Sequence, residues 1–252
     1  MALKTGEDLK LLGIRGSPHV LRVRLALRLK GLSYDYVEQD PRNNHKMGDL
    51  LRHSTVPVLL IHGGKPVHGS LNIILYVDEA FAGPSLLPAG CHARAVARYW
   101  ADFIDDTLVE AMYKAEGRNQ AAAAIEALEG ALRECSKPFF GGDNAGYVDV
   151  VLGSLLPWVC AADATWGTET LDPAMTPLLA TWKDRFSALD AAQGVMPDMG
   201  KVAGFATMMP ASHPKRSDLT LHVLTGFFYD SNCVYYLDGT IEATLHQRVP
   251  SL

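Results

Sequence analysis

The sequence predicts an α/β domain followed by an all-helical domain. Over residues 9–81, short apolar runs of strand length alternate with amphipathic segments, whereas apolar residues recur at helical spacing over most of residues 92–209. Residues 83–91, between these regions, are rich in glycine and proline, which is typical of a linker. The predicted domains are therefore residues 1–82 and 92–209, joined by a linker at 83–91.

Length, charge and cysteine pattern exclude several classes of function. A chain of 252 residues with a formal net charge of −5 has room for two domains but no general basic field for nucleic acid. No apolar run approaches the ~18 residues of a membrane span, and residues 1–10 lack the apolar core of a signal peptide. The four cysteines are scattered without a CxxC pair, which predicts free thiols and no metal site. We expect a cytoplasmic protein without nucleic-acid or membrane partners.

The first predicted strand and helix meet at a corner that contains Ser17. Leu9 to Ile14 form the apolar run, and the helix extends to a stop at Gly31. Ser17 suits the N-cap position because its hydroxyl can accept a hydrogen bond from a free backbone N–H, and Pro18 suits the first helical position. The corner can hold an anion at the positive end of the helix dipole. Taken alone, Ser17 is better interpreted as a plain N-cap than as a catalytic residue.

The remaining elements of the first domain follow in a recognisable order. Strands are predicted around residues 34–37, 58–61 and 65–67, with a hairpin turn at Gly63-Gly64. A weak helical segment is predicted near residues 47–51, and a stronger helix at 70–81. The order β-α-β-α-β-β-α predicts a thioredoxin-like domain with a small mixed sheet.

The second domain is predicted to be all helical. Its expected helices are 92–114, 119–134, 148–161, 174–189 and 198–208. Asp149 is interpreted as a capping carboxylate that stabilises the domain by ~1 kcal/mol. Asp105 and Asp106 are interpreted as a solvated or dimer-facing surface. Residues 210–252 form an atypical C-terminal extension for which no function is predicted.

Three features in order resemble the glutathione transferases: Ser17-Pro18 after the first strand, Val56-Pro57 before the third, and Gly69-Ser70 at the start of a helix. The segments LYVDEAFAGPSLLP and FFGGDNAGYVDVVLG are similar to the plant tau class of that family. The resemblance extends over about residues 9–209, and its motifs are specific as an ordered set although each is weak alone.

The resemblance implies a role for each motif. Ser17 would donate a hydrogen bond to the thiolate of glutathione, which is the co-substrate, and no metal is needed. Val56-Pro57 resembles the family's cis-proline junction, where the backbone of Val56 pairs with the cysteinyl part of glutathione. Ser70 matches the serine that binds the γ-glutamyl carboxylate.

Departures from the tau pattern predict a weak glutathione site. Gly69 stands where the class has a glutamate that faces the ligand's amino group, and Thr55 stands where a lysine is common. Lys46 is a candidate to compensate for the missing positive charge near the glycyl carboxylate. Each lost charged hydrogen bond costs ~1.5–3 kcal/mol of binding free energy.

The resemblance also implies an apolar pocket for the electrophile between the domains. His19 stands where the family usually carries a phenylalanine on the wall of this pocket. For His19, a solvent-tipped histidine of the first helical turn is an equal alternative. Met112, Tyr113 and Phe205 are the other expected pocket residues.

The leading hypothesis is a homodimeric glutathione transferase that conjugates glutathione to small hydrophobic electrophiles in detoxification and stress response. Peroxide reduction by the same thiolate is a second expected activity. The alternative is a non-catalytic or weakly catalytic ligand-binding protein on the same fold, suggested by Gly69, Thr55 and the C-terminal extension. A thiol transferase would need a cysteine at the corner where Ser17 stands.

Overall fold

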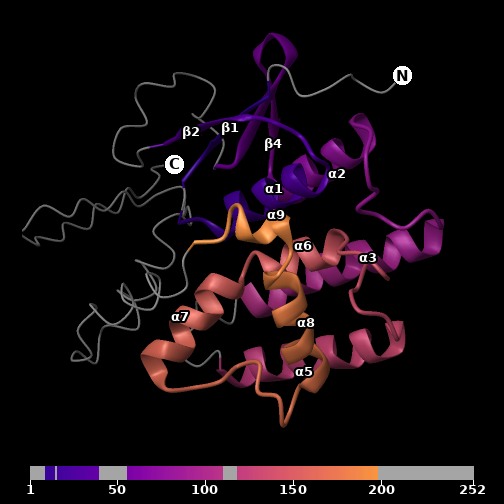
Figure 1. Cartoon of the computed structure of the whole chain (residues 1–252), viewed down its shortest axis with the longest axis vertical. Helices are drawn as coiled ribbons and strands as arrows, with labels where there is room; N and C mark the ends of the chain where they lie inside the picture. The colour runs from indigo at the N-terminus through magenta and orange to yellow at the C-terminus, as the bar shows by residue number, and fades with distance from the viewer. Residues whose placement is uncertain (1–8, 15, 40–55, 110–117, 198–252) are drawn as a thin grey trace, which may run out of the picture.

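The computed structural model describes residues 9–14, 16–39, 56–109 and 118–197 (Figure 1). Its N-terminal part is a four-stranded mixed sheet with the order β2-β1-β3-β4. The strands are β1 (Lys10–Gly13), β2 (Asp35–Glu38), β3 (Val58–Ile61) and β4 (Lys65–His68). β1 pairs with β2 in parallel, and the other two pairings are antiparallel. The predicted small mixed sheet is confirmed, and the helical segment predicted near residues 47–51 lies outside the described residues.

Two helices accompany the sheet, α1 (Pro18–Leu29) and α2 (Ser70–Ala80), both close to their predicted bounds. The turn between β3 and β4 forms one short 3-10 turn, η2 (His62–Gly64). Gly63 and Gly64 both have positive φ angles, 72° and 78°, which glycine adopts at low cost. The predicted glycine turn is therefore confirmed, although it is a helical turn.

The second part of the chain is helical, as predicted. Its elements are α3 (Cys91–Phe103), η3 (Ile104–Val109), α5 (Arg118–Cys135), α6 (Tyr147–Gly153), α7 (Leu156–Trp166), α8 (Pro177–Ser187) and α9 (Asp190–Gln193). The helix predicted at 198–208 lies outside the described residues. The division into domains at residues 82 and 92 stays a prediction.

Three helix bounds differ from the prediction, and a proline accounts for the first two. The helix expected over 148–161 is two helices, because Pro157 at the start of α7 has no N–H to continue the hydrogen-bond ladder of α6. The helix expected from residue 174 begins at Pro177, which occupies the first turn after Thr176. The helix expected over 92–114 changes at Ile104 to the π-helical segment η3.

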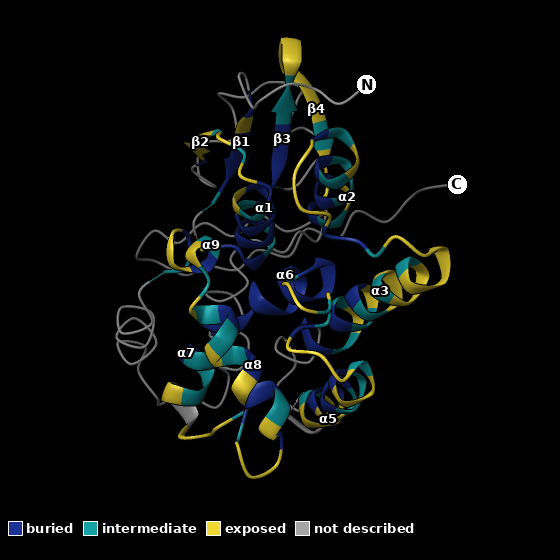
Figure 2. Ribbon diagram, turned by 45° about the vertical axis from the view of Figure 1, so that its right-hand side comes forward, coloured by how far each residue is buried: buried dark blue, intermediate teal, exposed yellow. Residues whose placement is uncertain are grey.

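Helix α1 is apolar on two faces and is buried on both (Figure 2). Val20, Val23 and Leu27 pack with the sheet in one hydrophobic cluster. Leu21 and Leu25 belong to a second cluster that is otherwise built largely from the C-terminal helices. A helix that is apolar around most of its circumference must be covered on several sides. Helix α1 therefore lies between the sheet and the helical part.

Helix α6 is buried along its whole length in the centre of the molecule (Figure 2). The stretch Tyr147–Ala164 is apolar enough to cross a membrane, but 78% of it is buried inside the protein, as expected of a core segment. Asp149 in α6 accepts hydrogen bonds from the backbone N–H groups of Phe140, Gly141 and Gly146 and from the indole of Trp182. Its predicted capping role is confirmed, and the carboxylate also anchors the preceding loop and α8.

Replacing Asp149 by alanine is expected to lower the free energy of unfolding by about 4 kcal/mol, because four donors, of which those of Gly146 and Trp182 are buried, lose their acceptor. Urea unfolding measures this effect. Asp143→Ala is the matched control in the same loop, since the Lys137–Asp143 pair is solvent-exposed and should contribute less than about 1 kcal/mol. Equal losses in the two variants would contradict the anchoring role of Asp149.

Candidate functional site

Three segments of the chain meet at one edge of the sheet, the one formed by the ends of β1 and β4 and the start of β3. Leu12 near the end of β1 pairs with Val58 at the start of β3, and Val58 in turn pairs with His68 at the end of β4. The chain leaves β1 toward Ser17, enters β3 from Val56-Pro57, and leaves β4 into Gly69-Ser70. The register therefore brings the three predicted motifs to the same edge.

Ser17 occupies the N-cap position of α1, as predicted. Its side-chain oxygen accepts a hydrogen bond from the backbone N–H of Val20 at 3.4 Å. Its backbone N–H donates to the carbonyl of Ile14 at 2.9 Å, which closes the corner after β1. The residue is 3% exposed. The hydroxyl is thus held at a helix N-terminus, where the helix dipole favours negative charge.

The other two motifs frame the same edge. The Val56–Pro57 peptide bond is cis, as the resemblance implied, and Pro57 is buried. Gly69 is the N-cap of α2 with φ 81° and ψ 127°, a conformation that strains any residue with a Cβ atom. Ser70 follows as the first residue of α2 and is buried. The N-termini of α1 and α2 therefore both present donors at this edge.

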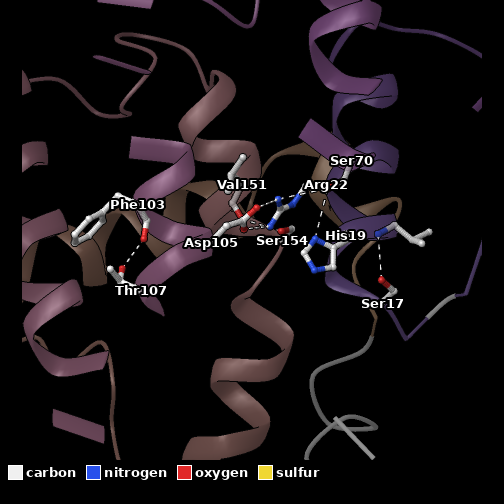
Figure 3. A network of polar contacts seen from close by, with 10 residues as sticks. Ser17, His19, Arg22, Ser70, Phe103, Asp105, Thr107, Val151 and Ser154 are labelled. Atoms are coloured by element: carbon white, nitrogen blue, oxygen red, sulfur yellow. Dashed lines mark hydrogen bonds and ion pairs between the residues drawn. The ribbon is translucent and has the colours of Figure 1, made fainter. Parts of the chain in front are cut away.

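A buried arginine links this edge to the helical part (Figure 3). Both terminal nitrogens of Arg22 in α1 bond the carboxylate of Asp105 in η3, at 2.8 and 2.7 Å. The Nη1 atom also lies 3.5 Å from the hydroxyl of Ser70. Arg22 is 0% exposed, whereas the Asp105 side chain is 25% exposed. The ion pair therefore fixes α1 against η3 directly behind Ser70.

His19, in the first turn of α1, points toward the same serine (Figure 3). Its Nδ1 atom lies 3.5 Å from the hydroxyl oxygen of Ser70. Burial lowers the pKa of His19 from 6.5 to about 4, helped by the positive charge of Arg22 and opposed by Asp105. The imidazole is neutral at physiological pH.

Residues 11–85 match the family described as glutathione S-transferase, N-terminal domain, and residues 96–190 match glutathione S-transferase, C-terminal domain. The chain is 47% identical over 214 residues to a probable glutathione S-transferase of Oryza sativa subsp. japonica, a match that covers 76% of this chain and 89% of the relative. This chain belongs to the glutathione S-transferases.

Solved structures agree with that assignment. The tau-class glutathione S-transferase of mango, Mangifera indica, is 34% identical with a TM-score of 0.74, covering 82% of this chain and all of that one. A rice glutathione S-transferase solved in complex with glutathione is 32% identical with a TM-score of 0.71, covering 81% of this chain and 98% of that one. The predicted membership of the tau class is confirmed.

The structure of this transferase corrects one interpretation and adds one residue. Asp105 is not a solvated surface carboxylate, because it pairs with Arg22 between the two parts of the chain. Asp106 is exposed, as expected. Arg22 was missed because the basic residues of this helix were all taken as polar positions between the apolar ones. The signal that could have found it is helical spacing: Arg22 lies about 200° around the helix from Arg24 and shares its face with the apolar Leu25 and Ala26.

Five predicted site residues, Lys46, Thr55, Met112, Tyr113 and Phe205, lie outside the described residues. A pocket of about 360 Å³ lies between the α3–η3 segment and α5, and none of Ser17, His19 and Ser70 lines it. Within the described ranges, no group of three potential ligands could hold a metal ion. Cys91, Cys135 and Cys160 are free thiols, as expected.

Asp105→Ala is expected to lower the free energy of unfolding by about 3 kcal/mol, because it leaves the buried guanidinium of Arg22 without its counter-charge. Asp106→Ala, one residue further along η3, removes an exposed carboxylate and is expected to change that free energy by less than about 0.5 kcal/mol. Chemical unfolding of both variants makes the comparison. The ion pair has no structural importance if the two substitutions are equivalent.

Proposed function

We propose that this chain is a glutathione transferase in which the Ser17 hydroxyl stabilises the glutathione thiolate. The observation that carries the proposal is the register of the sheet, which brings Ser17, Val56 and Ser70 to one edge. The thiolate attacks an electrophilic carbon, so that a carbon–sulfur bond forms while the leaving group departs or the acceptor π-bond takes up the electron pair. Neither a metal nor a covalent enzyme intermediate takes part.

The capping and catalytic roles of Ser17 are compatible. As an N-cap, the hydroxyl oxygen accepts from the N–H of Val20, which leaves its own proton available for a thiolate. A free thiol has a pKa near ~8.5, and lowering it by ~2 units requires about 2.7 kcal/mol. One hydrogen bond to the charged sulfur supplies ~1.5–3 kcal/mol, and the helix N-terminus adds ~0.3–1 kcal/mol. The two contributions together are sufficient.

The remaining contacts of glutathione are assigned to the same edge. Val56 pairs through its backbone with the cysteinyl part, and Ser70 with the N-terminus of α2 binds the γ-glutamyl carboxylate. Thr55 and Lys46 are assigned to the glycyl end. Gly69 contributes only its backbone, since it has no carboxylate to meet the ligand's amino group. We therefore infer a glutathione site of reduced affinity.

The electrophile is assigned to a neighbouring apolar pocket with contributions from His19, Met112, Tyr113 and Phe205. A homodimer is also proposed, and the apolar side chains that α3 exposes support it: Val96 is 40% and Tyr99 60% exposed. Detoxification in the cytoplasm and peroxide reduction by the same thiolate remain predictions.

A second candidate function is ligand binding with little turnover, which the missing side chain at Gly69 favours. An assay with a hydrophobic dye and an aryl halide at saturating glutathione distinguishes the two functions. Conjugation of the aryl halide supports the transferase, whereas saturable dye binding without conjugation supports the binding protein.

Ser17→Ala is expected to lower kcat/KM for conjugation by roughly 10- to 100-fold, because the thiolate loses one charge-assisted hydrogen bond. The pKa of bound glutathione, followed by the ultraviolet absorbance of its thiolate, should rise with this substitution. Ser17→Gly serves as the stability-matched variant, since glycine weakens an N-cap by only a few tenths of a kcal/mol. Full activity in both variants would exclude the assigned role of Ser17.

Gly69→Glu is expected to lower the KM for glutathione by roughly 10-fold, because it adds a carboxylate opposite the ligand's amino group. A new Cβ atom meets only the Cβ of Asn72, at 3.9 Å, but φ 81° strains the backbone at a cost of about 1–3 kcal/mol in stability. Gly69→Ala carries the same strain without the carboxylate. The assignment fails if alanine and glutamate change KM equally.

A further inference from the structure

The Ser70 hydroxyl is held between two side chains of α1 (Figure 3). The Nη1 atom of Arg22 and the Nδ1 atom of His19 each lie 3.5 Å from its oxygen. Both reach across from α1 to the N-terminus of α2, 48 and 51 residues further along the chain. The orientation of the hydroxyl therefore depends on helix α1.

The hydrogen-bonding capacity of these groups restricts how they share the serine. Arg22 can only donate, so the oxygen of Ser70 accepts from it. A bound carboxylate can only accept, and it therefore takes the single hydroxyl proton of Ser70. With that proton engaged, His19 interacts favourably only if Nδ1 carries a hydrogen and donates to the serine oxygen.

A neutral imidazole suits this arrangement because its two tautomers are close in energy. It accepts the serine proton at Nδ1 when the site is empty, and it donates from Nδ1 when a carboxylate is bound. Burial keeps His19 neutral, with a pKa of about 4. A phenylalanine, which the family usually carries at this position, can neither accept nor donate this hydrogen bond.

We propose that His19 is a positioning residue, which orients the Ser70 hydroxyl toward the carboxylate of the γ-glutamyl group and thereby strengthens binding of that end of the substrate. The inference rests on the proposed function, because it assumes that glutathione is the ligand. His19 follows Ser17 by two positions, so one turn of α1 serves both the thiol and the γ-glutamyl carboxylate. This contribution forms a larger share of the binding free energy in a chain that carries Gly69 in place of an acidic side chain.

The test combines three variants with two ligands. Calorimetry measures binding of glutathione and of an analogue in which the γ-glutamyl α-carboxylate is replaced by hydrogen, and steady-state assays give KM and kcat for conjugation. His19→Phe removes both nitrogens, His19→Gln places its amide near the position of Nε2, and His19→Asn places an amide group near the position of Nδ1. His62→Phe, in the exposed turn between β3 and β4, is the matched control.

We expect His19→Phe and His19→Gln to weaken glutathione binding by roughly 3- to 10-fold, the worth of one neutral hydrogen bond. They should raise the KM for glutathione, while His19→Asn restores the affinity for glutathione and His62→Phe has no effect. None of the variants should change binding of the analogue. In a Ser70→Ala background, His19→Phe should have no further effect, because the hydroxyl that it positions is absent.

Two results overturn the inference while leaving the proposed function intact. In the first, His19→Phe weakens binding of glutathione and of the analogue by the same factor, which indicates a general packing role. In the second, it changes neither affinity. If the unmodified protein binds no glutathione and shows no turnover, the proposed function fails and the inference fails with it.

Discussion

The position of the candidate site depends on one buried ion pair, Arg22 with Asp105. Arg22 is fully buried, and an unpaired guanidinium inside a protein costs several kcal/mol. Asp105 supplies the counter-charge through two hydrogen bonds at 2.7 and 2.8 Å. Because Arg22 belongs to α1 and Asp105 to η3, this ion pair forms only when the helical part is packed against α1. The docking in turn fixes Ser17 and Ser70 relative to the rest of the chain.

The π-helical segment η3 takes part in this constraint. A π-helical turn contains more residues than an α-helical one, so it changes the direction in which successive side chains leave the helix. Along η3, Asp105 points to Arg22, whereas Asp106 is exposed and lines the pocket against α5. Successive side chains of a helix leave it about 100° apart, so these two adjacent identical residues have different environments. Neither the spacing nor the chemistry of the pair Asp105-Asp106 distinguishes them in the sequence.

Much of the fold and part of the site follow from local patterns. The strands, the Ser17 cap and the start of α2 at Ser70 depend on residues close together in the chain, so composition and spacing predict them. The Arg22–Asp105 contact joins residues 83 positions apart, and no local pattern encodes it. The four donors to Asp149 likewise come from the preceding loop and from α8, so its sequence neighbourhood indicated only a helix cap.

At Gly69 the backbone conformation and the absent side chain have opposite consequences for the site. Its φ of 81° directs the chain from β4 into α2, and a residue with a Cβ atom would be strained there. Glycine removes the strain, but in the proposed glutathione site it would also lack the charged contact to the ligand's amino group. The donors at the N-terminus of α2 remain, because they belong to the backbone. In the proposed site the contacts that the fold provides would therefore be kept, and the affinity would depend on the few side chains, such as Ser70 and its partners on α1, that we propose to orient the ligand.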